Sequence, residues 1–181
     1  MRRTIIAPAD PGTNALAELK DWLGIRTPAE DALLARLIAS ALEACEAFTG
    51  TMPLSQNCSE VLPVRAEWQR LSARPVSAIT HALGLPAEGS AFPLAGDAYE
   101  FDIAANGIGM IRVTRPGAAG RVEVRYLAGL TSQWIGLPEG LRHGALRLAA
   151  HLYRSRDSGT DAALPAAVAA LWRPWRAMRL A

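Results

Sequence analysis

Three histidines, His81, His143 and His151, are the side chains best suited to acid–base catalysis or metal binding near neutral pH. His143 and His151 lie eight residues apart in one expected helix, so two helical turns, or about 12 Å of rise, separate them. They cannot share one metal ion, and no further ligand set of the kind that binds zinc accompanies them. We therefore expect ordinary surface or half-buried histidines and no metal site.

Other motifs that could carry chemistry have structural explanations. Gly107-Ile108-Gly109 is half of a dinucleotide fingerprint, but it lies between two expected strands and lacks the third glycine, so it predicts a hairpin. The acidic pair Glu30-Asp31 suits a helix N-terminus, and Glu100 with Asp102 suits the solvent face of a strand. No serine lies in a nucleophile elbow. The sequence therefore predicts no catalytic residue, no cofactor and no enzyme.

Binding chemistry concentrates in residues 171–181, where two tryptophans and three arginines follow an expected last helix. Ordering about nine residues costs about 9 to 18 kcal/mol, whereas burying four large side chains returns about 2 to 3 kcal/mol each. The segment must therefore pack on its own domain or on a partner. Docking in a partner's groove is favoured over self-packing, over nucleic-acid binding by arginine and tryptophan, and over membrane-surface binding. The candidate docking residues are Trp172, Arg173, Trp175, Arg176, Met178, Arg179 and Leu180.

Two helices are expected early in the chain, after an extended arm over residues 1–12. An apolar stripe predicts a short helix over residues 14–23 that ends at Gly24. Thr27, Pro28 and Glu30 have the spacing of a capping box and predict the start of the second helix. Apolar residues three and four apart then continue that helix to Gly50.

A β-rich segment is expected between residues 53 and 132, because the hydrophobic period changes from 3.6 to 2. Residues 121–126 and 99–103 alternate charged and apolar side chains, as strands with one wet face do. Asn106-Gly107 predicts a tight turn. Further strands are expected at 59–64, 68–71, 76–83 and 110–113.

Helices resume at Pro138 and again at about Pro165, the second ending near Trp172. Gly144 lies inside the first of these helices, where it costs about 1 kcal/mol of helix propensity relative to alanine, and it predicts a close helix contact. The fold class is therefore α+β, a small α-helical bundle of two N-terminal and two C-terminal helices with an antiparallel β-rich insertion.

Composition and charge fit a globular chain of 181 residues, half of them apolar. No run approaches the roughly 18 apolar residues that span a membrane, and no secretory signal is expected. Cys45 and Cys58 make no ligand spacing and are interpreted as buried small side chains, in preference to a disulfide or a metal site. From Arg112 onward the net charge is +7, whereas residues 1–111 carry −5. This asymmetry permits head-to-tail self-association or docking on an acidic partner, although two solvated faces explain it equally well.

In this order, the elements resemble the head-tail connector, or adaptor, proteins of long-tailed bacteriophages and gene transfer agents. The helix pair carries LAELKDWLG at 16–24, EDALL at 30–34 and ACEAFTG at 44–50. The β-rich segment carries RPVSAI at 74–79 and YLAG at 126–129. The C-terminal part carries LPEGLRHGAL at 137–146, HLYRSR at 151–156, LP at 164–165 and LWRPWR at 171–176.

The resemblance implies a structural role in head completion. Such connectors form a ring, commonly of twelve copies, beneath the portal protein, extend the DNA channel without sequence-specific binding, and support a downstream tail or stopper protein. The C-terminal segment would insert into the portal. The resemblance further implies one connector domain over 1–181, with a helix pair (13–52), a β-rich insertion (53–132), C-terminal helices (136–172) and a docking tail (173–181). The protein would be assembled in the bacterial cytoplasm, reside in the virion, and have no membrane partner. The alternative is a soluble nucleic-acid-binding module that uses its basic C-terminal tail.

Overall fold

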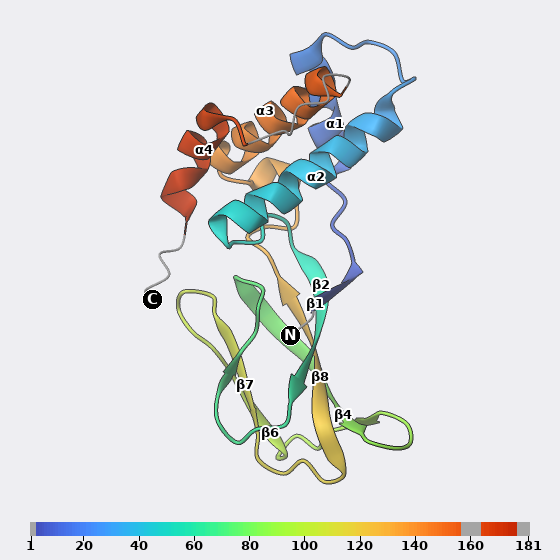
Figure 1. Ribbon diagram of the computed structural model, residues 1–181, viewed down its shortest axis with the longest axis vertical. Helices are drawn as coiled ribbons and strands as arrows, with labels where there is room; N and C mark the ends of the chain where they lie inside the picture. The colour runs from blue at the N-terminus through green and yellow to red at the C-terminus, as the bar shows by residue number, and fades with distance from the viewer. Residues whose placement is uncertain (1–2, 157–163, 177–181) are drawn as a thin grey trace. The chain divides into compact units, whose positions relative to one another are not determined.

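The computed structural model describes residues 3–156 and 164–176, and these residues form four α-helices and two antiparallel sheets (Figure 1). The α+β class expected from the sequence is confirmed. The chain groups into two compact units. The β unit comprises Met1–Pro8 and Ser55–Gly129, and the helical unit comprises Ala9–Leu54 and Leu130–Ala181. The single connector domain over 1–181 stays a prediction.

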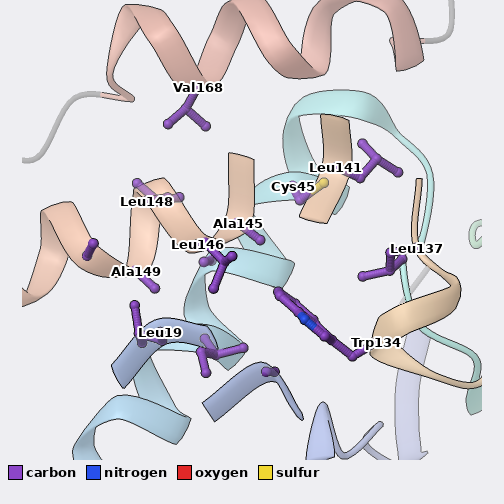
Figure 2. Close-up of a cluster of buried hydrophobic side chains, with 14 of the residues drawn as sticks. Leu19, Cys45, Trp134, Leu137, Leu141, Ala145, Leu146, Leu148, Ala149 and Val168 are labelled. Carbon is purple, nitrogen blue, oxygen red and sulfur yellow. The ribbon is translucent and has the colours of Figure 1, made fainter. Parts of the chain in front are cut away.

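The helical unit contains α1 (Gly12–Leu23), α2 (Asp31–Thr49), the 3₁₀ turn η1 (Trp134–Gly136), α3 (Glu139–Ser155), α4 (Ala166–Trp172) and the 3₁₀ turn η2 (Arg173–Trp175). One apolar cluster joins all four helices because each contributes buried side chains to it. Figure 2 shows Leu19, Cys45, Leu141, Leu148 and Val168 among these side chains, together with Trp134 from η1. Within the described residues, no helix is both long and apolar enough to cross a membrane.

The start of α2 differs from the prediction. The helix begins at Asp31, and no side chain caps its first turn. Residues 28–31 instead form a turn in which the Asp31 amide donates to the Pro28 carbonyl at 3.1 Å. The Glu30 carboxylate, which a capping box would use, accepts hydrogen bonds from Tyr153 and Arg156 of the α3 end. The capping box was therefore a wrong prediction, because tertiary partners take its acidic residue.

The β unit contains a five-stranded sheet in the order β1-β2-β8-β4-β5 and a three-stranded sheet in the order β3-β7-β6. The strands of the first sheet are β1 (Arg3–Ala7), β2 (Gln56–Pro63), β4 (Val76–Pro86), β5 (Phe92–Pro93) and β8 (Ala119–Ala128). Those of the second are β3 (Gln69–Arg70), β6 (Tyr99–Ile103) and β7 (Gly109–Val113). The expected arm over residues 1–12 is thus partly a strand, because β1 pairs antiparallel with β2. The turn expected at Asn106-Gly107 joins β6 to β7, and Gly107 takes a positive φ of 75° there.

The middle strand β8 confirms the alternation read from residues 121–126. Val122, Val124 and Tyr126 are buried, whereas Arg121 and Arg125 are exposed. The inward face also holds the buried carboxylate of Glu60 on β2, whose Oε2 accepts hydrogen bonds from the Tyr126 hydroxyl at 3.1 Å and from Ser72 N and Oγ at 2.9 and 3.0 Å. Burial and the nearby Glu60 charge both raise the pKa of the Tyr126 phenol.

Candidate docking site at the end of the last helix

The tryptophan and arginine side chains of the C-terminal segment are positioned by α4 and η2. Pro165 sits at the N-cap of α4 with an extended ψ of 137°, and the helix runs from Ala166 to Trp172. Pro174 follows inside η2, where the chain tightens into a 3₁₀ turn and then leaves at Arg176 in an extended conformation. Because proline cannot continue an α-helix, Pro174 ends α4 at this point.

Trp172 anchors the segment in the core of the helical unit. Its side chain is fully buried, and its indole nitrogen donates to the Leu141 carbonyl at 3.3 Å. A Cβ atom placed on Gly144 would lie 2.1 Å from that nitrogen, so only glycine leaves room for the indole. The close helix contact expected at Gly144 is therefore confirmed.

The residues that follow Trp172 are exposed but still touch the helical unit. Trp175 is 37% exposed to solvent. Its indole nitrogen lies 3.4 Å from the position that a Cβ atom on Gly140 would occupy. The Arg176 guanidinium lies over the Phe48 ring of α2, 5.5 Å from its centroid. The segment thus packs on its own unit as far as Arg176 while presenting one indole and the side chains of Arg173 and Arg176 to solvent.

The seven candidate docking residues therefore divide into three groups. Trp172 belongs to the core, where its side chain is inaccessible to a partner. Arg173, Trp175 and Arg176 are brought together on the surface by η2. Met178, Arg179 and Leu180 lie outside the described residues.

Sequence reasoning did not identify Phe48 and Gly140 as partners of the segment. Phe48 lies on α2, and its ring packs at a tilt against Trp172, with ring centroids 6.1 Å apart. Gly140 carried a usable signal, because it is four residues from Gly144 and both therefore lie on one face of α3. That pair of glycines marks where the two tryptophans of the segment approach the helix.

The three histidines considered for catalysis lie on two elements of different units. His81 is exposed on β4, whereas His143 and His151 lie on α3. Among the described residues, no group of three or more histidine, cysteine or acidic side chains has the geometry of a metal site. Cys45 and Cys58 are both buried, as expected, and burial raises the pKa of the Cys45 thiol to about 12.

A surface depression of about 320 Å³ on α1 also lacks a reactive arrangement. Its lining includes Lys20, Asp21 and Arg26. The Lys20 ammonium is engaged by the Asp31 carboxylate at 2.6 Å, an ion pair that joins α1 to α2. The arrangement therefore indicates a structural contact between helices.

Comparison with solved structures shows similarity over the whole chain. A chain in the neck of an empty gene transfer agent particle computed with C6 symmetry is 29% identical with a TM-score of 0.80. A chain in the virion of a native gene transfer agent particle is 28% identical with a TM-score of 0.75. A third, in the neck of a native particle computed with C12 symmetry, is 29% identical with a TM-score of 0.76. In each case 100% of this chain and 98% of the other chain are covered.

No protein-family model matches the chain, and no curated protein matches it. The solved chains are components of particles, and both the helices and the sheets of this protein take part in the similarity, because it covers the full length. The protein is therefore similar to neck components of phage-like particles.

Proposed function

We propose that this protein is a structural head-tail connector, or adaptor, of a phage-like particle such as a gene transfer agent, and that it is not an enzyme. The observation that carries the proposal is the full-length similarity to chains of gene transfer agent particles at 28–29% identity. The proposed connector forms a ring beneath the portal protein, extends the DNA channel, and supports a downstream tail or stopper protein. Its place is the head-tail interface of the virion.

A ring of twelve copies is part of the proposal. The similar necks were computed with C6 and C12 symmetry, and a twelve-membered ring is compatible with both. Neighbours in a cyclic ring meet through unlike surfaces. The acidic and basic parts of the sequence, with net charges of −5 and +7, both contribute to each compact unit, so the proposed unlike surfaces are patches within the units.

The C-terminal segment is proposed to dock on the portal protein. Trp172 acts as the internal anchor, because it is buried against Gly144 and Leu141. Arg173, Trp175 and Arg176 are the exposed part of the docking set, and Met178, Arg179 and Leu180 complete it. A ring multiplies weak contacts, because each docking event after the first is effectively intramolecular.

The test is assembly of DNA-filled heads that lack the connector, supplied with purified variants. We expect R173Q/W175A/R176Q, and separately a chain without residues 177–181, to fold but to leave the heads incomplete. The matched control is R65Q/W68A/R70Q, which removes two exposed arginines and one exposed tryptophan from the β unit. Thermal unfolding confirms that each variant is folded. Completed particles from either tail variant would refute portal docking by this segment.

A further inference from the structure

A row of basic side chains runs along the outward face of α3. His143, Arg147, His151 and Arg154 follow one another at intervals of four, four and three residues, so they share one side of the helix. Arg147, His151 and Arg154 are exposed and His143 is half-buried. The four positions span about 16 Å of helix rise. We call these residues the α3 basic ridge.

The ridge is not neutralised by the described residues around it. Other described cations do have acidic partners: Lys20, Arg112, Arg115, Arg125, Arg142 and Arg156 all form ion pairs. Arg147 and Arg154 form none with any described acidic residue. Asp157 and Asp161, which follow α3 in the sequence, lie outside the described part of the chain.

The elements that flank α3 also leave the ridge uncovered. α3 packs against α1, α2 and α4 (Figure 1). The exposed side chains of α4 are alanines, at positions 166, 167 and 170. On α1, Glu18 lies 3.9 Å from Arg142 and so is directed to a cation outside the ridge.

An exposed tryptophan holds one end of the ridge in a fixed arrangement. Trp22 of α1 is 42% exposed, and its ring meets His143 edge-on with centroids 5.4 Å apart. The Arg147 guanidinium lies over the same indole at 5.9 Å, and its Nε donates to His143 Nε2 at 3.3 Å. The remaining N–H groups of Arg147 are therefore oriented before any ligand arrives, which lowers the entropy lost on binding.

We propose that the α3 basic ridge, with Trp22 at one end, binds the phosphate backbone of double-stranded DNA. Duplex DNA carries one negative charge per about 1.7 Å of its axis. The ridge offers two guanidinium groups, Arg147 and Arg154, about 10 Å apart along a straight helix, with the exposed imidazole of His151 between them. A protein partner would instead call for an apolar centre in the contact surface, and the ridge has only Trp22. The biological context rests on the proposed function, since a neck component surrounds DNA, but the binding itself does not.

The test measures binding of a short labelled duplex to the full-length protein by anisotropy over a range of salt concentrations. Each phosphate contact contributes about 0.9 to the slope of log K against log salt. We expect R147Q/R154Q to reduce the steepness of that slope by about 1.8. The ratio of the wild-type DNA association constant to that of the variant should therefore fall about tenfold between about 50 and 200 mM salt. R147K/R154K, which keeps both charges, should retain most of the slope.

The matched control is R65Q/R70Q, which removes the same charge from exposed positions of the β unit and should leave the slope unchanged. An equal loss in this control would overturn the proposal, because it would show a response to net charge only. Loss of the slope in R173Q/R176Q with none in R147Q/R154Q would assign DNA binding to the tail and not to the ridge. Absence of binding by the wild-type protein at low salt would also refute the ridge.

Failure of this proposal is distinguishable from failure of the connector role. If the ridge variants complete heads normally and retain the DNA slope, the ridge is wrong and the connector stands. If they lose self-association with an unchanged slope for DNA, the ridge is a contact between copies of the chain, which also overturns DNA binding. If R147Q/R154Q loses the expected slope for DNA while the tail variants still complete heads, portal docking by the tail is refuted and DNA binding by the ridge stands.

Discussion

Gly144 and Trp172 show how one missing methyl group decides the packing of two helices. The indole nitrogen occupies the space that a Cβ at position 144 would need, and it uses that position to reach the Leu141 carbonyl. The end of α4, and with it the start of the exposed segment, is therefore fixed by a residue in the middle of α3.

We predict that G144A lowers the free energy of unfolding by about 1 to 3 kcal/mol, the usual cost of forcing an extra carbon into a packed core. This loss exceeds the gain of about 1 kcal/mol in helix propensity from glycine to alanine. Urea denaturation monitored by tryptophan fluorescence measures it.

G140A is the matched control for G144A on the same face of α3. Its Cβ would lie 3.2 Å from the Leu171 carbonyl oxygen and 3.4 Å from the Trp175 indole nitrogen, so the strain is smaller and the propensity gain offsets it. We expect a change near zero. A stabilised G144A protein would contradict the packing described for Trp172.

Residue types predicted some of these contacts and missed others for a physical reason. A glycine inside an apolar helix signals close approach, and Gly144 was read that way from the sequence. The partner could not be read, because which tryptophan reaches it depends on the tertiary packing of α4. The same limit applies to Arg176 and Phe48, which are far apart in the sequence and meet only in the folded unit.

The turn between α1 and α2 is held by a contact with the far end of α3. The Tyr153 hydroxyl donates to Glu30 Oε2, the Arg156 guanidinium pairs with Glu30 Oε1 at 3.1 Å, and that guanidinium lies 4.6 Å from the centre of the Tyr153 ring. The hydrogen bond from Tyr153 is the main cause that holds the pKa of the Glu30 carboxyl below its ordinary value, and Arg156 adds to it.

Because the pKa of Glu30 is lower in the folded state than in the unfolded state, its contribution is present above the ordinary value of 4.5 and is lost as the pH falls through the lower folded value. We therefore predict that E30Q destabilises the protein at neutral pH and flattens the acid side of its stability profile. Chemical denaturation between neutral pH and the acid limit measures this.

The control for E30Q is E43Q, which changes an exposed acid on α2 and should leave the profile parallel to that of the wild type. Part of the acid dependence remains in both variants, because hydrogen bonding by Arg125 and Ser59 also lowers the pKa of Glu123. An E30Q profile that stays parallel to the wild type would contradict a stabilising role for the Tyr153 contact.

Helices and strands with a clear hydrophobic periodicity were predictable from the sequence. Elements whose bounds depend on tertiary contacts were not. The alternation in β8 and the apolar stripe of α2 each record one buried face, so the pattern exists before folding. The start of α2 was misread because Glu30 satisfies a cap motif locally while its tertiary partners bind it more strongly. β1 and β5 carry too few residues or too little alternation to be seen without the neighbouring strand, whereas β3 (Gln69–Arg70) lies within the strand expected at 68–71. The 3₁₀ turn η2 depends on the packing of Trp172.

At the scale of the whole molecule, the uneven charge predicts salt-sensitive association between copies. Neighbours that bring a basic part against an acidic part attract each other, and that attraction weakens as the Debye length falls from about 10 Å at 0.1 M salt to about 3 Å at 1 M. We expect sedimentation velocity to show larger species at low salt and smaller species at high salt. The control is addition of an uncharged osmolyte at matched viscosity. Association that salt leaves unchanged would indicate apolar contacts between copies.

The chain passes between its two units three times, after Pro8, after Leu54 and after Gly129. In the β unit, the edge strand β1 precedes the first of these connections, and all the other strands lie between the second and the third. A protease that cuts one of these connections therefore leaves the two units covalently linked through the others. The connections likewise act in parallel when a load passes from one unit to the other, and a single cut leaves two chain segments that packing within the units holds together.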